Sequence, residues 1–194
     1  MFKLLTKQIL LLTLIVLVIW AIIFGSYLPL IKSRRFISAL GSLSLIKTIE
    51  QFKTFFNRSL NFYSPIGDEE VTKFLVSDIL SFVSDDNQSE SGSRMLVDYI
   101  EPRIFQDDVR HLLAMAQIYW ILWEKYGYNE ADFEKAENYF KKAYVIGPKL
   151  PPVLYGMFDF YKAKGDVVTA KEIGEEILNY WPNDEEIENY INSR

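Results

Sequence analysis

The feature that most constrains this chain is an apolar run near its N-terminus. No charged residue occurs from Gln8 to Ile31, and Leu, Ile, Val, Phe and Trp dominate the run. An α-helix rises about 1.5 Å per residue, so a helical run of this length can cross the roughly 30 Å hydrocarbon core of a bilayer. The sequence therefore predicts a membrane anchor in residues 1–31, with a single transmembrane helix at about residues 8–31.

A cleavable secretory signal is the alternative interpretation of this run. Lys3 and Lys7 supply the basic start that such a signal has. The apolar core of a signal is usually about 7 to 15 residues, and the present run is longer. Bulky Phe24, Tyr27 and Leu28 also occupy the place where small residues normally precede the cleavage site. We therefore expect an uncleaved, single-pass anchor in the cell membrane.

Charge is distributed unevenly around the anchor. All 26 acidic residues come after the apolar run, together with 19 of the 21 basic residues, so the last 163 residues carry a net charge of −7. Nucleic-acid binding needs a basic face that displaces counterions from phosphates, so this acidity argues against a nucleic-acid partner. The absence of cysteine excludes disulfides, thiolate metal sites and cysteine nucleophiles.

The side of the membrane on which the remainder lies is left open by the sequence. Basic residues near a span prefer the cytoplasm, and more of them come after the apolar run than before it. Lys32, Arg34, Arg35 and Lys47 come after it, and Lys3 and Lys7 come before it. The count favours a cytoplasmic domain, whereas an N-terminal anchor of this kind often exports the domain attached to it.

Residues 32–105 are predicted to form a membrane-proximal helical region. Apolar residues recur at steps of three or four in residues 45–62, which indicates an amphipathic helix. Ser64–Gly67 interrupt it, and Asp68 is placed to cap a second helix over residues 68–83. The stripe expected to be buried on the second helix is Phe74, Leu75, Ile79, Phe82 and Val83.

The end of this region combines a polar loop with a short helix. Residues 84–93 contain no apolar side chain, and their Ser, Asp, Asn and Gly predict a mobile loop. A short helix over residues 95–100 and a long one over residues 107–126 are expected after the loop. No segment alternates apolar and polar residues for long enough to form a strand, so the predicted fold class is all-α.

Self-similarity appears when residues 117–150 are aligned with residues 151–184. Small and proline residues then match at a separation of 34, namely Ala136 with Ala170 and Pro148 with Pro182. This pattern resembles the tetratricopeptide repeat, a pair of helices packed through a small residue early in the second helix and ended by a proline. The resemblance implies a stack of helical repeats over residues 106–194.

The match is closer in the second copy than in the first. The first-helix positions of the second copy are Leu154, Met157, Phe158 and Tyr161, and Phe158 departs from the small residue that usually stands there. In the first copy Gly127 comes four residues late and Ala136 eight residues late, which two insertions would explain. The alternative is a plain helical bundle with coincidental spacing.

A stack needs about three repeats, so the ends require caps. We expect the helices at 45–62 and 68–83 to serve as an atypical N-terminal cap. At the other end a helix beginning at Pro182–Asp184 carries Ile187, Tyr190 and Ile191 on one face. That helix is predicted to be the C-terminal cap.

A second, less specific resemblance covers more of the chain. The apolar span, the segment SPIGDEE at residues 64–70 and the helix at residues 111–127 are similar to the tail of some O-antigen ligase or polymerase-like membrane proteins. The resemblance implies an accessory region. It carries over no catalytic residue, because the chemistry of those enzymes belongs to a membrane domain of many spans.

The sequence offers little for catalysis. His111 is the only histidine, which removes histidine-paired nucleophiles and most zinc sites, and it is expected as an ordinary surface or boundary residue of the long helix. The acidic clusters lack the spacing of a calcium loop, and the scattered glycines form no phosphate-binding loop. We therefore predict that the chain is not an enzyme and holds no cofactor or metal.

The leading hypothesis is a membrane-anchored scaffold that holds a protein partner, for example in envelope assembly. The alternatives are an accessory region of a polysaccharide ligase or polymerase and a purely structural spacer. In a repeat stack the partner lies against outward positions of each first helix. Those positions are Arg110, Gln117, Trp120 and Glu124 in the first copy and Tyr155, Asp159 and Lys162 in the second.

Overall fold

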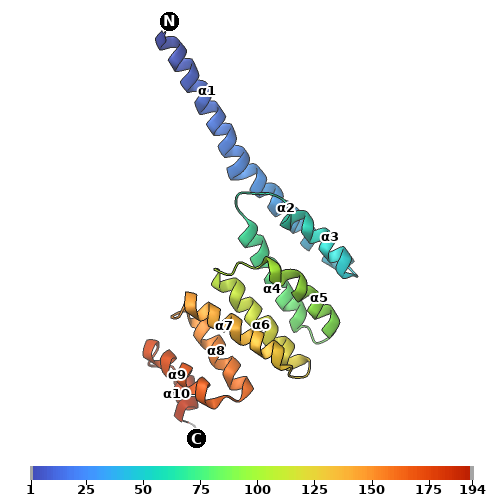
Figure 1. Ribbon diagram of the computed structural model, residues 1–194, viewed down its shortest axis with the longest axis vertical. Helices are drawn as coiled ribbons and strands as arrows, with labels where there is room; N and C mark the ends of the chain where they lie inside the picture. The colour runs from blue at the N-terminus through green and yellow to red at the C-terminus, as the bar shows by residue number, and fades with distance from the viewer. Residues whose placement is uncertain (1, 193–194) are drawn as a thin grey trace. The chain divides into compact units, whose positions relative to one another are not determined.

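The computed structural model describes residues 2–192, and all regular secondary structure in that range is helical (Figure 1). The predicted all-α class is therefore confirmed. The chain forms two compact units, Met1–Phe74 and Leu75–Arg194, and each is described by itself.

The first unit begins with one long, nearly continuous helix. It consists of α1 (Phe2–Ile22), a π-helical turn (Ile23–Tyr27) and α2 (Leu28–Leu40). The π turn precedes Pro29, whose missing N–H would leave a carbonyl one turn earlier without its helical partner, and a wider turn accommodates that gap. The apolar window of this helix contains no buried residue, and by length and composition it could cross a membrane.

A helical hairpin comes after the apolar segment. A 3₁₀ turn (Leu43–Leu45) ends α2, and the hydroxyl of Thr48 then accepts a hydrogen bond from Gln51 N and caps α3 (Ile49–Leu60). The two helices run antiparallel and pack through phenylalanine rings, with Phe56 4.5 Å from Phe52 and 5.9 Å from Phe36 between centroids. The predicted helix at 45–62 is thus shorter, because its first four residues form the 3₁₀ turn and the connection.

Lys32 joins the hairpin to the segment after it. Its side chain is 1% exposed, its Nζ donates to Phe62 O at 2.8 Å, and it forms an ion pair with Asp68. The hydroxyl of Ser59 donates to Lys32 O at 2.9 Å. Asp68 is the first residue of α4 (Asp68–Ser84). Its carboxylate therefore lies at a helix start and also pairs with Lys32.

The second unit contains the rest of α4 and six further helices. They are α5 (Glu90–Ile100), α6 (Val109–Lys125), α7 (Glu130–Ile146), α8 (Pro151–Lys164), α9 (Val167–Tyr180) and α10 (Glu185–Asn192). A 3₁₀ turn (Glu101–Arg103) succeeds α5. Helix α6 packs on α7, α8 on both α7 and α9, and α9 on α10, so neighbours in the sequence lie side by side (Figure 1).

Acidic and amide side chains fix where several of these helices begin. Asp108, Asn129 and Asp166 each accept a hydrogen bond from a backbone N–H of the first turn of α6, α7 and α9. Such caps satisfy donors that have no partner within the helix. Gly165 ends α8 with a φ of 80°, a left-handed conformation that glycine adopts without a Cβ clash.

An aromatic cluster around Phe160 of α8 forms the centre of this unit. Its ring lies 4.5 Å from Phe133 and 5.2 Å from Phe140 of α7, and 5.8 Å from Trp120 of α6. Close approach of α7 and α8 depends on Gly156, since a Cβ there would stand 2.9 Å from the Phe140 ring. The aromatic side chains therefore hold three helices together.

The polar loop is shorter than predicted. Helix α5 begins at Glu90 because Ser89 accepts a hydrogen bond from Gly92 N, and only residues 85–89 connect it to α4. The connection is also hydrogen-bonded to the end of α6, where Lys125 donates to Val83 O at 3.1 Å and the Tyr126 hydroxyl donates to Gln88 O at 2.8 Å. The expectation of a mobile loop over residues 84–93 is corrected accordingly.

Two of the five residues in the predicted stripe of α4 are not buried. Leu75, Ile79 and Val83 have no exposed surface, whereas Phe74 and Phe82 are 54% and 37% exposed. The buried face of α4 consists of Val71, Thr72, Leu75, Val76, Ile79 and Val83. Each phenylalanine comes one residue before Leu75 or Val83 and lies outside this face.

Candidate functional site

An open cleft lies between α4 and α6 within the second unit. It has a volume of about 330 Å³ and is lined by Leu80, Ser84, Gln117, Trp120, Ile121 and Glu124. Leu80, Trp120 and Ile121 are partly buried and give it an apolar wall, while Ser84, Gln117 and Glu124 are exposed. An apolar wall with a polar rim is the usual composition of a site that binds a protein segment.

Trp120 belongs to the cleft and to the core at the same time. Its ring packs edge-on against Phe160 at an interplanar angle of 78°. Its indole N–H is buried and has no hydrogen-bond partner among the described residues. An unpaired buried donor of this kind costs about 1 to 3 kcal/mol. Trp120, which the sequence predicted for the groove, thus lines the cleft with one part of its side chain and packs in the core with another.

The predicted residues of α8 face α10 and its connection. The Tyr155 hydroxyl donates to Asp184 Oδ2 at 2.5 Å, and Lys162 Nζ lies 5.4 Å from the centre of the Tyr190 ring. The hydrogen bond to Asp184 raises the pKa of Tyr155 to about 12. Asp159 is exposed between them, and desolvation raises its pKa. None of the three lines the cleft beside Trp120.

Arg110 lies in the first turn of α6 and pairs with the residue that caps the helix. Its Nη2 is 2.6 Å from Asp108 Oδ2, and its side chain is half exposed. The seven residues predicted for one groove are therefore in three places. Gln117, Trp120 and Glu124 line the cleft, Arg110 is at the start of α6, and the α8 residues face α10.

A polar cluster that the sequence did not suggest surrounds Glu101. The hydroxyl of Tyr119 donates to Glu101 Oε2 at 2.7 Å, that of Tyr139 donates to Oε1 at 2.9 Å, and Lys135 Nζ lies 3.2 Å from Oε2. Nearby, Arg94 forms two parallel hydrogen bonds with the buried carboxylate of Asp132, at 3.0 and 2.8 Å. These contacts join α6 and α7 to α5 and to the turn after it.

The electrostatics of this cluster favour a structural role. Burial alone would raise the pKa of Glu101, but hydrogen bonds from Tyr119, Tyr139 and Lys135 outweigh it and hold the pKa below its ordinary value. Desolvation, with the adjacent carboxylate, raises the pKa of both tyrosines. The carboxylate stays ionised and the phenols stay protonated at neutral pH, so no group is poised to exchange a proton in catalysis.

His111 differs from its predicted position. It is fully buried near the start of α6, where its Nδ1 accepts a hydrogen bond from Phe105 N at 3.0 Å. The side chain thus holds the turn before α6, and the surface or boundary position expected for it is wrong. Among the described residues, no group of three or more His, Cys, Asp or Glu side chains is arranged to hold a metal ion.

Comparison with known proteins returned no relative. No family model matches the chain, and no curated protein or solved structure is significantly similar to it.

Proposed function

We propose that this chain is a membrane-anchored scaffold whose helical domain binds a segment of a protein partner in the α4–α6 cleft. The anchor is supported by the exposure of the apolar helix. Its large apolar side chains from Ile9 to Ile23 are 40% exposed or more. Contiguous apolar surface of this extent is not stable in water, and a lipid bilayer would cover it.

The helical domain is best understood as a short tetratricopeptide-like stack. Three backbone hydrogen bonds recur 34 positions apart, which supports a repeated unit. In the first copy Gly147 N donates to Ala143 O and Leu150 N to Gly147 O, at 2.9 and 3.1 Å. In the second, Trp181 N donates to Ile177 O and Asp184 N to Trp181 O, at 2.8 and 3.3 Å.

The third pair begins the next helix in each copy. Leu154 N donates to Leu150 O at 3.2 Å, and Glu188 N donates to Asp184 O at 3.0 Å. Helices α8 and α10 thus begin after equivalent turns. Ala136 of α7 and Ala170 of α9 also have no exposed surface, as the repeat requires of its small residue.

Helix lengths account for the irregular first copy. It spans residues 109–150 and has 42 residues, against 34 for residues 151–184. Helices α6 and α7 have 17 residues each, while α8 and α9 have 14 each. The remaining two residues lengthen the connection from α6 to α7. The insertions are therefore spread over both helices and the turn.

The cleft beside Trp120 is the observation that carries the binding role. It combines a tryptophan with an unpaired buried N–H, two aliphatic side chains and three exposed polar groups on facing helices. Tryptophan is enriched among residues that dominate interface energies. A partner that places an apolar side chain against Trp120 and hydrogen-bonds Gln117 or Glu124 would use both the apolar wall and the polar rim of the cleft.

Purification of the tagged full chain from detergent tests both parts of this proposal. The chain should remain in the membrane pellet after carbonate extraction and should bring a stoichiometric partner with it. Trp120→Ala should weaken binding of that partner by about 2 kcal/mol or more while circular dichroism shows unchanged helicity. Trp181→Ala is the matched control, because Trp181 is partly exposed and lies outside the cleft. Equal retention by both variants would exclude the cleft.

A further inference from the structure

Basic residues are concentrated in the segment directly after the apolar helix. Between Lys32 and Gly67 there are six Lys and Arg residues and a single acidic residue, Glu50. Residues 75–194, in contrast, contain 12 basic and 22 acidic residues. The first unit therefore has a local positive charge that the overall net charge of −5 conceals.

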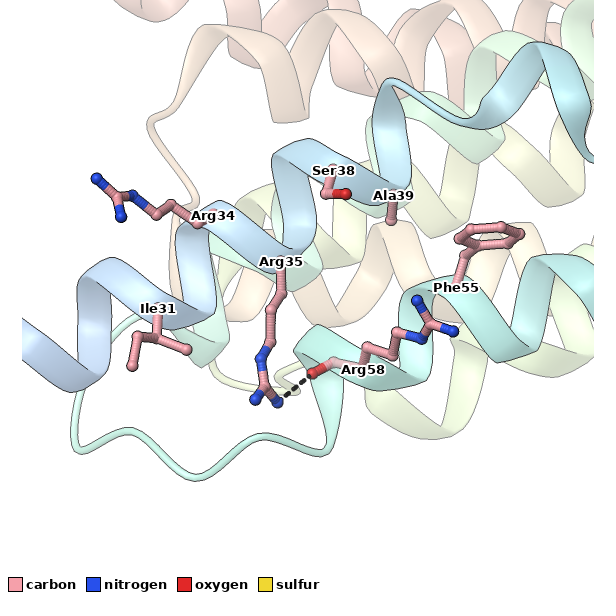
Figure 2. A pocket seen from close by; sticks show the side chains of 7 residues that line it. All are labelled: Ile31, Arg34, Arg35, Ser38, Ala39, Phe55 and Arg58. Carbon is pink, nitrogen blue, oxygen red and sulfur yellow. Dashed lines mark hydrogen bonds between the residues drawn. The ribbon is translucent and has the colours of Figure 1, made fainter.

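Three of these basic residues line one cleft of the α2–α3 hairpin. Its volume is about 490 Å³, and its walls are Ile31, Arg34, Arg35, Ser38, Ala39, Phe55 and Arg58. Figure 2 shows Arg35 reaching from α2 towards α3, Arg58 lying below Phe55, and Arg34 projecting from the outer edge of the cleft. The cleft thus has a guanidinium on each side and an apolar base.

The contacts of the arginines leave their charge uncompensated. Arg35 donates to Arg58 O at 3.1 Å, and its guanidinium lies 4.2 Å from the centre of the Phe62 ring. The Arg58 guanidinium lies 5.5 Å from the Phe55 ring. No carboxylate among the described residues pairs with any of the three arginines. Planar, unpaired guanidinium groups are suited to bidentate binding of phosphate oxygens.

The position of the cleft along the helix selects the source of the phosphate. Arg34 and Arg35 come three and four residues after Ile31, which is about 4.5 and 6 Å along the axis. The headgroup layer of a bilayer extends about 5 to 7 Å beyond its hydrocarbon core on each side. A helix whose uncharged run ends at Ile31 therefore carries these arginines at the level of the lipid phosphates.

The surroundings of the cleft fit the same depth. Lys32 binds Phe62 O, so the end of α3 lies at the level of Lys32. The adjoining Tyr63 is 69% exposed and Tyr27 is 58% exposed. Exposed tyrosines at one end of a basic cleft, next to the apolar helix, are typical of segments at the membrane–water interface.

We propose that the cleft formed by Arg34, Arg35 and Arg58 binds the phosphate of an anionic membrane-lipid headgroup, with the apolar base against the upper part of the lipid. This proposal rests on the membrane anchoring proposed above. It adds a lipid-binding site next to the anchor, through which the α2–α3 hairpin would bind the leaflet that contains anionic lipids.

Native mass spectrometry of the full chain in detergent tests the site. Phosphatidylglycerol and phosphatidylcholine of equal chain length are added at equal concentration, and inorganic phosphate is added in a separate arm. The unchanged chain should retain phosphatidylglycerol at least about tenfold better, and Arg34→Gln/Arg58→Gln should reduce that preference to about twofold or less. Neither guanidinium donates a hydrogen bond within the described chain, so circular dichroism should be unchanged.

Lys47→Gln/Lys53→Gln is the matched control, since both lysines are exposed, belong to the same unit and lie outside the cleft. It should keep the preference, and an equal loss would mean diffuse attraction and overturn the proposal. Displacement of the lipid by millimolar inorganic phosphate, or equal retention of the two lipids by the unchanged chain, would also overturn it. Arg34→Lys/Arg58→Lys keeps the charge and should lose part of the preference, whereas full retention contradicts guanidinium recognition.

Carbonate extraction of the same variants separates this proposal from the anchoring on which it rests. All variants should stay in the pellet, because α1 is unaltered. Release of the unchanged chain would contradict the anchoring itself, while pellet retention without lipid preference contradicts the lipid site alone.

Discussion

Substitution of Ala170 by leucine would test the close packing of α8 on α9. Ala170 lies in the first turn of α9 and has no exposed surface. Leucine would add three carbon atoms, and because Ala170 has no exposed surface these atoms would have to fit inside the core. Inserting extra methylene groups into a well-packed core typically costs about 1 to 3 kcal/mol, because side chains leave their rotamers or the helices separate.

The assay is thermal unfolding of residues 68–194, monitored by circular dichroism at 222 nm. For a domain of this size 1 kcal/mol corresponds to about 3 to 6 °C in Tm, so Ala170→Leu should lower the Tm by about 3 to 18 °C. Ala163→Leu is the matched control, because Ala163 is exposed on α8 and the same change there should stay within about 0.5 kcal/mol. A Tm that is unchanged, or equally lowered in the control, would refute the repeat packing.

Three further outcomes are expected. Lys32→Met should speed chymotryptic cleavage after Phe62, because the buried ammonium no longer holds that carbonyl, whereas exposed Lys53→Met should not. The pKa of Glu101 is lowered, so its carboxylate stabilises the fold above the ordinary pKa of 4.5, and this stabilisation is lost as the pH falls below that value. The free energies of urea unfolding of Glu101→Gln and of the unsubstituted chain should therefore differ at neutral pH and become equal in acid. Protease added to inverted vesicles should digest residues 75–194 if the basic residues after the span are cytoplasmic, and protection there would place them outside.

Helix positions could be predicted from the sequence wherever a periodic apolar stripe coincides with a local cap. The long helix expected at 107–126 is α6, whose start is fixed by Asp108. The start of α5 was missed because the residues around it are all polar, and polarity alone indicates a loop. Ser89 nevertheless caps the helix by accepting a hydrogen bond from Gly92 N. A capping serine is a local signal for a helix start that a search for apolar periodicity does not detect.

The contacts at the sites depend on segments far apart in the sequence, which is why the sequence could not specify them. Glu101 meets Tyr119, Lys135 and Tyr139 only after α6 and α7 pack against each other, and no local pattern distinguishes it from other surface glutamates. His111 was expected at the surface or boundary for a different reason: the hydrogen bond that it accepts comes from Phe105 N in the preceding turn, and the conformation of that turn has no clear sequence signal.

Counting charges along the sequence could not predict the arginine cleft. Arg34 and Arg35 were recognised in the sequence as basic residues just after the span. Their association with Arg58 requires α3 to turn back along α2, and that reversal is set by the 3₁₀ turn and the Thr48 cap. The sequence thus predicted positive charge just after the span, whereas the cleft itself depends on the packing of α3 against α2.

Site-specific photo-crosslinking in cells tests the scaffold role most directly. A benzoylphenylalanine replaces Gln117, which lines the α4–α6 cleft, or Asn138, an exposed amide of α7 outside it. The scaffold role predicts one discrete protein adduct in the membrane fraction from position 117, lost on adding Trp120→Ala, and no such adduct from position 138. Equal labelling from both positions, or an adduct that persists with Trp120→Ala, would contradict it.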